Sequence, residues 1–126
     1  MQTTKLKTPS VRESSETELD RVTFEVLRNL FEYTCDRMTT VLQRASFSPI
    51  LSDMVDFSNA IYDPEMRLLS QAANTPVHLA AMKFSAHAVR DEFGIQNMKE
   101  GDIYVVNDPY QGGTHINDTV SYTHLT

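Results

Sequence analysis

Residues 101–118 read GDIYVVNDPYQGGTHIND, and the interpretation of the whole chain starts from this stretch. Its first part, residues 103–106, is a short run of β-branched and aromatic residues, which favours a buried strand. Its second part, residues 107–118, is dense in Gly, Pro and polar residues, which favours a loop. Because α/β proteins often place their chemistry in loops at strand ends, the stretch predicts a functional loop carried by a strand.

The segments before this stretch predict two helices. Apolar residues recur at spacings of three and four from Phe24 to Ala45, so we expect a helix over about residues 20–47 with Asp20 as its N-cap. Its apolar face is interpreted as a core face, and Cys35 on that face as a buried structural thiol. Similar spacing from Leu79 to Phe93 predicts a second helix, which Gly94 would end.

A β-hairpin is expected between the two helices. Residues 57–62 and 67–71 are strand-like, and residues 63–66 have the composition of a turn. The pairing would bury Phe57, Ile61 and either Leu68 or Leu69.

The order helix, hairpin, helix, strand, loop, strand predicts an α/β or α+β fold. So small a sheet would leave an open edge and an uncovered face. We therefore expect residues 19–126 to be the N-terminal fragment of a larger domain. Residues 1–18 are rich in Thr, Ser, Lys and Glu, which predicts a flexible polar tail.

Composition and charge exclude several classes of protein. The formal net charge of −6, from 17 acidic and 11 basic residues, argues against nucleic acid as the main partner. The single cysteine excludes a disulfide within the chain and fits a reducing compartment. No apolar run approaches the roughly 18 residues that a membrane span needs, and the first 15 residues lack the apolar core of a secretory signal. We expect a cytoplasmic protein.

His115 and Asp118 form the first candidate site. A His and a carboxylate three residues apart can converge on one divalent ion if the backbone turns between them, and this donor pair suits Mn²⁺, Fe²⁺ or Zn²⁺. The alternative is a loop His that is hydrogen-bonded to a turn Asp. Two ligands are also fewer than the three that a catalytic metal usually has.

Three further positions could take part in chemistry. Asp108 could be a metal ligand, a carboxylate that orients His115 or a general base, or it could simply accept backbone N–H bonds in a turn. His78, at the start of the second predicted helix, could contact substrate or carry a proton, or could be a partly buried structural His. The polar group of Asp53, Asp56 and Ser58 could line a pocket, but capping and turn roles are the favoured interpretation.

Several stretches resemble the hydantoinase B/oxoprolinase family. They are DRVTFEVLRNL at residues 20–30, LQRASFSP at 42–49, DFSNAIYDP at 56–64, PVHL at 76–79 and, most specific of all, residues 101–118. The resemblance covers about residues 20–120. The last six residues, 121–126, depart from the family pattern and are interpreted as foreign sequence, so His124 receives no role.

The resemblance implies chemistry that spacing alone does not. The family includes 5-oxoprolinases, N-methylhydantoin hydrolases, and acetone and acetophenone carboxylases. Many members work with a hydantoinase A-type subunit that binds ATP and phosphorylates the substrate. In the acetone carboxylase branch, a His-x-x-Asp pair and a further His hold Mn²⁺. The pair maps to His115 and Asp118, and the further His would lie beyond residue 126.

The resulting expectation is a fragment of an enzyme subunit that is inactive alone. It would belong to an ATP-coupled amidohydrolase that opens hydantoin or 5-oxoproline rings, or to a ketone carboxylase. The cofactor would be a divalent metal, Mn²⁺ or Zn²⁺, and ATP would bind to the partner subunit or domain. Asp108 and His78 would be the catalytic residues. The alternatives are a non-catalytic assembly module of a hydantoinase-type complex and a metal hydrolase that does not use ATP.

Overall fold

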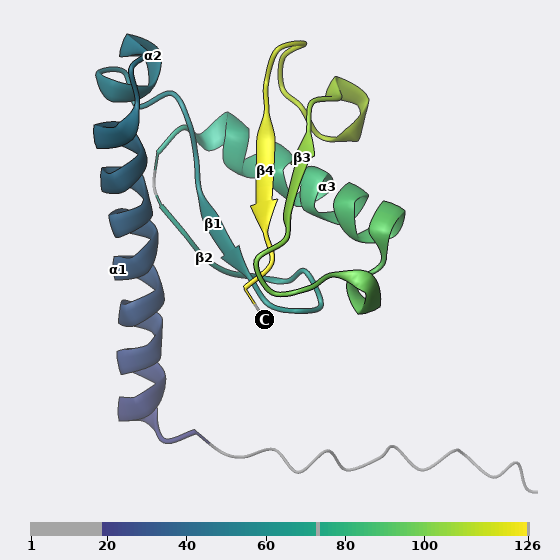
Figure 1. The fold of residues 1–126 in the computed structure, drawn as a ribbon. Coiled ribbons are helices and arrows are strands. Elements are labelled where there is room, and N and C mark those ends of the chain that lie inside the picture. The colour runs from purple at the N-terminus through teal and green to yellow at the C-terminus, as the bar shows by residue number, and fades with distance from the viewer. Residues whose placement is uncertain (1–18, 73, 126) are drawn as a thin grey trace, which may run out of the picture.

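The computed structural model describes residues 19–72 and 74–125, and the expected tail at residues 1–18 lies outside this part (Figure 1). The predicted order of helix, hairpin, helix, strand, loop and strand is confirmed, with three short helices added. In chain order the elements are α1 (Arg21–Ala45), α2 (Pro49–Ser52), β1 (Ala60–Tyr62), β2 (Leu68–Gln71), α3 (Pro76–Phe93), η1 (Ile95–Asn97), β3 (Ile103–Val106), η2 (Pro109–Gln111) and β4 (Val120–Thr123).

The long helix α1 begins where the sequence predicts. The Asp20 carboxylate accepts hydrogen bonds from the backbone N–H groups of Val22 and Thr23, at 2.9 and 3.0 Å. These bonds satisfy amides that have no partner within the helix. The helix ends at Ala45, and Pro49 begins α2 at a helix position where a proline loses no hydrogen bond.

The expectation that the apolar face of α1 is a core face holds only for its middle. Cys35 is fully buried, and burial raises the pKa of its thiol, as expected of a structural cysteine. Phe24, by contrast, is 54% exposed and Leu42 is 42% exposed. The reason is geometric, because α1 packs on β1, β2 and α2 while much of its length projects past them (Figure 1).

The strands form two separate antiparallel pairs, β1–β2 and β3–β4. In the first hairpin Ile61 pairs with Ser70, and the register shifts between Ile61 and Tyr62. Phe57 is buried as predicted, but Leu68 and Leu69 are both about half exposed, at 49% and 47%. The predicted mixed class of α/β or α+β is confirmed, and its sheets consist of antiparallel hairpins.

One apolar cluster joins α3 to both hairpins. Its buried members are Met66, Ala86, Val89 and Met98, and partly buried Tyr62, Ile95, Tyr104, Val106 and Tyr122 pack against them. The helix α3 lies across the β3–β4 hairpin (Figure 1). Strand β3 is therefore covered on one face only, and the expectation of a buried strand was wrong. Ile103 and Val105, on its other face, are 65% and 63% exposed.

The alternation of exposed and half-buried residues along β3 follows from the pleat of a strand with one covered face.

None of the helices in the described part of the chain has the length and apolar composition needed to cross a membrane.

Candidate functional site

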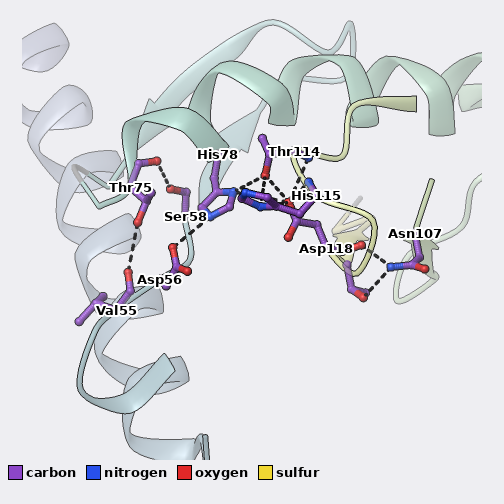
Figure 2. Close-up of polar contacts among 10 residues, drawn as sticks. Val55, Asp56, Ser58, Thr75, His78, Asn107, Thr114, His115 and Asp118 are labelled. Carbon is purple, nitrogen blue, oxygen red and sulfur yellow. Dashed lines mark hydrogen bonds and ion pairs between the residues drawn. The ribbon is translucent and has the colours of Figure 1, made fainter. Parts of the chain in front are cut away.

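Three polar segments meet at the N-terminal end of α3 (Figure 2). They are the loop between α2 and β1, which carries Asp56; the first turn of α3, which carries His78; and the loop between η2 and β4. This last loop carries Thr114, His115 and Asp118. These five side chains form one polar cluster, which we call the α3 cluster.

The first two segments are joined by hydrogen bonds around the start of α3. The Ser58 hydroxyl donates to the Thr75 carbonyl at 2.8 Å, and the Thr75 hydroxyl donates to the Val55 carbonyl at 3.4 Å. Val55 has a φ of 54°, which a β-branched residue rarely adopts. Such strain costs on the order of 1–3 kcal/mol and persists only where the surroundings enforce it. The strained residue directly precedes Asp56, whose carboxylate contacts His78 in the first turn of α3.

The third segment is shaped by η2 and by Gly112. The Asp108 carboxylate accepts the Tyr110 N–H at 2.8 Å and caps η2. Gly112 has a φ of 99°, and a Cβ placed on it would lie 2.5 Å from the backbone nitrogen of Ser85. Only glycine allows both this conformation and so close an approach to α3. The loop is thereby held against the helix that carries His78.

A second contact closes the base of the same loop. The Asn107 side-chain amide donates to the Asp118 carbonyl and, at 3.3 Å, contacts the Thr119 hydroxyl (Figure 2). Residues 107 and 118 are thus linked across the loop. Thr114, His115 and Asp118 are presented together on one side of it.

Within the α3 cluster, His78 lies between two oxygen groups. Its Nε2 is 3.2 Å from Asp56 Oδ1, and its Nδ1 is 3.0 Å from the Thr114 hydroxyl oxygen. The Nδ1 atom of His115 lies 3.4 Å from Asp118 Oδ2, while that of His78 lies 3.9 Å from the same oxygen. The two imidazole rings are edge to face, with their centroids 6.3 Å apart. Both histidines thus converge on one carboxylate.

Asp118 is held in its ionised form. Its Oδ2 accepts the Thr114 hydroxyl and the backbone N–H groups of Thr114 and His115, at 3.0 and 2.9 Å. These bonds, that of the Thr114 hydroxyl foremost, hold the pKa of the Asp118 carboxyl below its ordinary value. The other oxygen, Oδ1, has no hydrogen-bond partner among the described residues and is free to accept a ligand.

The donor types suit a divalent ion, although their number is incomplete. Imidazole nitrogen and carboxylate oxygen are common ligands of Mn²⁺ and Zn²⁺. The His115 side chain is 66% exposed, while His78 and Asp118 are 19% and 23% exposed, so the cluster is open to solvent on the His115 side. Across residues 19–72 and 74–125, no three His, Cys, Asp or Glu side chains are placed to hold one metal ion. The pair His115–Asp118 fits part of a metal site.

The structure brings three of the four candidate site residues together. His78, His115 and Asp118 meet in the α3 cluster, whereas Asp108 makes no hydrogen bond to them and is engaged at η2. Sequence reasoning missed Thr114 entirely and treated Asp56 mainly as a turn residue. Nothing local marks Asp56, because its partner lies 22 residues away along the chain. The local sequence feature that could have indicated Thr114 is its position between a Gly pair and His115.

The profile of one family, Hydantoinase B/oxoprolinase, matches residues 20–124. An uncharacterized protein of Methanocaldococcus jannaschii is 34% identical over 102 residues, which are 79% of this chain and 18% of that protein. The Arabidopsis thaliana protein 5-oxoprolinase 1 is 33% identical over 109 residues, which are 86% of this chain and 8% of that protein. The caprolactamase subunit beta of Pseudomonas jessenii is 32% identical over 104 residues, which are 82% of this chain and 18% of the subunit.

The chain thus spans less than a fifth of the length of each of these relatives. No solved structure gives a significant match. The matched residues include every member of the α3 cluster and the hairpins and helices that position it. The chain belongs to the hydantoinase B/oxoprolinase family.

Proposed function

We propose that this chain supplies part of the active site of an ATP-coupled amidohydrolase that opens cyclic amides. The observation that carries the proposal is the α3 cluster, in which His78, His115 and Asp118 converge although they come from separate segments. Two of the relatives are named for 5-oxoproline and caprolactam, which are both cyclic amides. Carboxylation of a ketone, as in carboxylases of the family, is the alternative reaction.

In this proposal His115 and Asp118 bind a divalent metal, Mn²⁺ or Zn²⁺, with the remaining ligands supplied from outside the described residues. The ionised Asp118 and its free Oδ1 support this assignment. A bound ion would supply Lewis-acid chemistry at a substrate oxygen.

His78 is proposed to hold or pass a proton at Nδ1. Asp56 meets the opposite ring nitrogen at 3.2 Å and so fixes the orientation of the ring. The His78 side chain is 19% exposed, which places it at the wall of the cluster rather than on the open surface. Asp108 is proposed as a second proton-transfer group, acting through Oδ2 while its Oδ1 accepts the Tyr110 N–H.

ATP is proposed to act on the substrate at a hydantoinase A-type partner subunit or domain in the cytoplasm. Phosphorylation of the amide oxygen there would make the carbonyl carbon more electrophilic, so that water adds to it and the ring C–N bond breaks with proton transfer to the ring nitrogen. A second water would then release the phosphate. The name of the Pseudomonas relative, a subunit beta, supports a partner subunit in this family. Turnover of 5-oxoproline or hydantoin with ATP withheld separates this route from an ATP-independent metal hydrolase.

The metal assignment is tested by titrating the full-length protein with Mn²⁺ under electron paramagnetic resonance. We expect His115→Gln and Asp118→Asn each to weaken binding by about 10–100-fold or more, as loss of even an outer-shell partner does. His87→Gln is the matched control, because His87 lies on α3 outside the cluster. Unchanged Mn²⁺ affinity in the double variant would contradict the assignment.

A second candidate function is a non-catalytic assembly module. The observation that favours it is the exposed apolar surface of α1, on which several large side chains are 38–59% exposed: Phe24, Val26, Leu27, Leu30, Met38, Val41 and Leu42. Such a surface is usually covered by another protein surface. We propose a hydantoinase A-type subunit as the occupant.

Co-elution with that subunit in size-exclusion chromatography tests the second candidate. The double variant Met38→Glu/Leu42→Glu should abolish co-elution, because each carboxylate would be desolvated at the contact. Asn29→Glu on the same helix should not. If the double variant still co-elutes, α1 is not the contact surface.

A further inference from the structure

The hydroxyl group of Thr114 lies at the centre of the α3 cluster. Its oxygen is 3.0 Å from His78 Nδ1 and 3.3 Å from His115 Nδ1, and it hydrogen-bonds to Asp118 Oδ2 (Figure 2). One small group therefore touches three of the side chains to which the proposed function assigns the chemistry, His78, His115 and Asp118. We propose that Thr114 is a positioning residue, whose hydroxyl sets the tautomer of His115 in the metal-free protein and holds His78, His115 and Asp118 in their mutual arrangement.

The hydrogen atoms around this hydroxyl can be counted. A threonine hydroxyl has one proton to donate and two lone pairs to accept with. The proton goes to Asp118 Oδ2, which is ionised and acceptor-only. The lone pairs then face the Nδ1 atoms of His78 and His115, so each contact is a hydrogen bond only if that Nδ1 carries the proton.

His115 Nδ1 also lies 3.4 Å from Asp118 Oδ2, but this contact lacks hydrogen-bond geometry. The Thr114 hydroxyl is therefore the group that favours the Nδ1–H form of His115 in the metal-free protein. The same hydroxyl bonds to Asp118 and so keeps the His115 ring beside this carboxylate.

The backbone at Thr114 separates this role from a purely structural one. The Thr114 N–H donates to Asp118 Oδ2 at 3.0 Å, so the turn from 114 to 118 is held without the hydroxyl. The side-chain methyl limits χ1 and keeps the hydroxyl aimed at the cluster. If Thr114 had only a structural role, its backbone N–H and its methyl would be enough. The proposed role depends on the hydroxyl alone.

Two substitutions test the hydroxyl separately from the methyl. Thr114→Val keeps the shape and the backbone bond but removes the hydroxyl, whereas Thr114→Ser keeps the hydroxyl. The first measurement is the long-range ¹H–¹⁵N NMR spectrum of ¹⁵N-histidine in the metal-free, full-length protein. Wild type and Thr114→Ser should show His115 as the Nδ1–H tautomer, and Thr114→Val should show a shift toward Nε2–H.

Mn²⁺ titration is the second measurement. Thr114→Val should weaken binding by about 10–100-fold, the usual effect of losing an outer-shell partner, and Thr114→Ser should restore it to near the wild-type value. If Thr114→Val unfolds, Thr114→Ala replaces it, since Ala also lacks the hydroxyl and adds no bulk. Unchanged His115 signals in a folded variant without the hydroxyl would overturn the proposal.

This inference rests on the proposed function, but the two can fail separately. If wild type binds neither Mn²⁺ nor Zn²⁺ while Thr114→Val still changes the His115 tautomer, the metal assignment is wrong and the positioning role stands. If wild type binds Mn²⁺ and Thr114→Val binds it equally well with the same tautomer, the positioning role is wrong and the metal assignment stands.

Discussion

At the scale of single residues, Asp102 shows how one carboxylate holds the turn before β3. Its Oδ2 accepts the Lys99 backbone N–H at 2.9 Å and the Tyr104 hydroxyl at 3.0 Å. These bonds, that of Lys99 foremost, hold the pKa of the Asp102 carboxyl below its ordinary value. A carboxyl whose pKa is lower in the folded than in the unfolded protein stabilises the fold in its ionised form.

The sign of the pH dependence follows. The contribution of Asp102 is fully present above the unfolded pKa of about 3.9 and is lost as the pH falls through the lower folded value. We expect Asp102→Asn to lower the urea midpoint at pH 7 and to narrow the difference between the midpoints at pH 7 and pH 3. Asp36→Asn is the control, because the Asp36 carboxylate makes no hydrogen bond with another described residue. If the urea midpoints of Asp102→Asn at pH 7 and pH 3 differed as much as those of the wild type, the stabilising role of the ionised Asp102 carboxyl would be contradicted.

The members of the α3 cluster were only partly predictable from the sequence. The pair His115–Asp118 could be named because a spacing of three is a local pattern, and the loop that carries it has an unusual composition. The contact of Asp56 with His78 spans 22 residues and depends on how the α2–β1 loop folds back on α3. No local pattern encodes such a contact. Thr114 was missed because threonine in a polar loop has many ordinary uses.

At the scale of elements, the site depends on how closely the η2–β4 loop approaches α3. Gly112 and Gly101 both have a positive φ, of 99° and 85°. A Cβ on Gly112 would overlap the backbone nitrogen and the hydroxyl of Ser85, at 2.5 and 2.6 Å, whereas a Cβ on Gly101 would meet no atom within 4 Å. The two positions share the backbone strain and differ in the steric overlap.

Alanine substitutions at the two glycines separate these effects. Gly101→Ala should cost about 1–2 kcal/mol, the strain of an L residue in the left-handed region. Gly112→Ala should cost more and should also weaken Mn²⁺ binding, because the loop must move away from α3 and carry His115 and Asp118 with it. Thermal unfolding and Mn²⁺ titration measure the two effects. Equal losses of stability and unaltered Mn²⁺ binding in both variants would show that the close approach is unimportant.

The elements themselves were well predicted, because helix caps and apolar periodicity are local. Asp20, Gly94 and the turn at residues 63–66 lie where the sequence places them. What periodicity cannot tell is what covers an apolar face. The face of α1 was taken for core, and β3 was taken for a buried strand. Each lacks a covering surface over part of its length within residues 19–125.

At the scale of the whole molecule, the two hairpins and α3 are stabilised by the same apolar cluster. Met66 belongs to the turn of the first hairpin and is 2% exposed, because it packs with Ala86 and Val89 of α3. Tyr104 and Tyr122 of the second hairpin pack against the same cluster. The two hairpins share no sheet, so this cluster joins them to α3 and, together with the contact of Gly112 with Ser85, fixes the η2–β4 loop relative to His78.

The shared cluster predicts cooperative loss of both hairpins when Met66 is truncated. Met66→Ala should cost about 2–5 kcal/mol, the usual range for truncation of a buried Met, and it leaves the backbone strain at this position unchanged. Tyrosine fluorescence, measured in a Tyr33→Phe/Tyr110→Phe background so that it reports Tyr62, Tyr104 and Tyr122 alone, should shift in urea together with the helical circular dichroism. Met54→Ala is the control, since Met54 is 72% exposed and its truncation should change stability by less than about 0.5 kcal/mol. If the tyrosine signal were lost at lower urea than the helical signal, α1 would be stable without the cluster, and the hairpins would not share one cooperative unit with it.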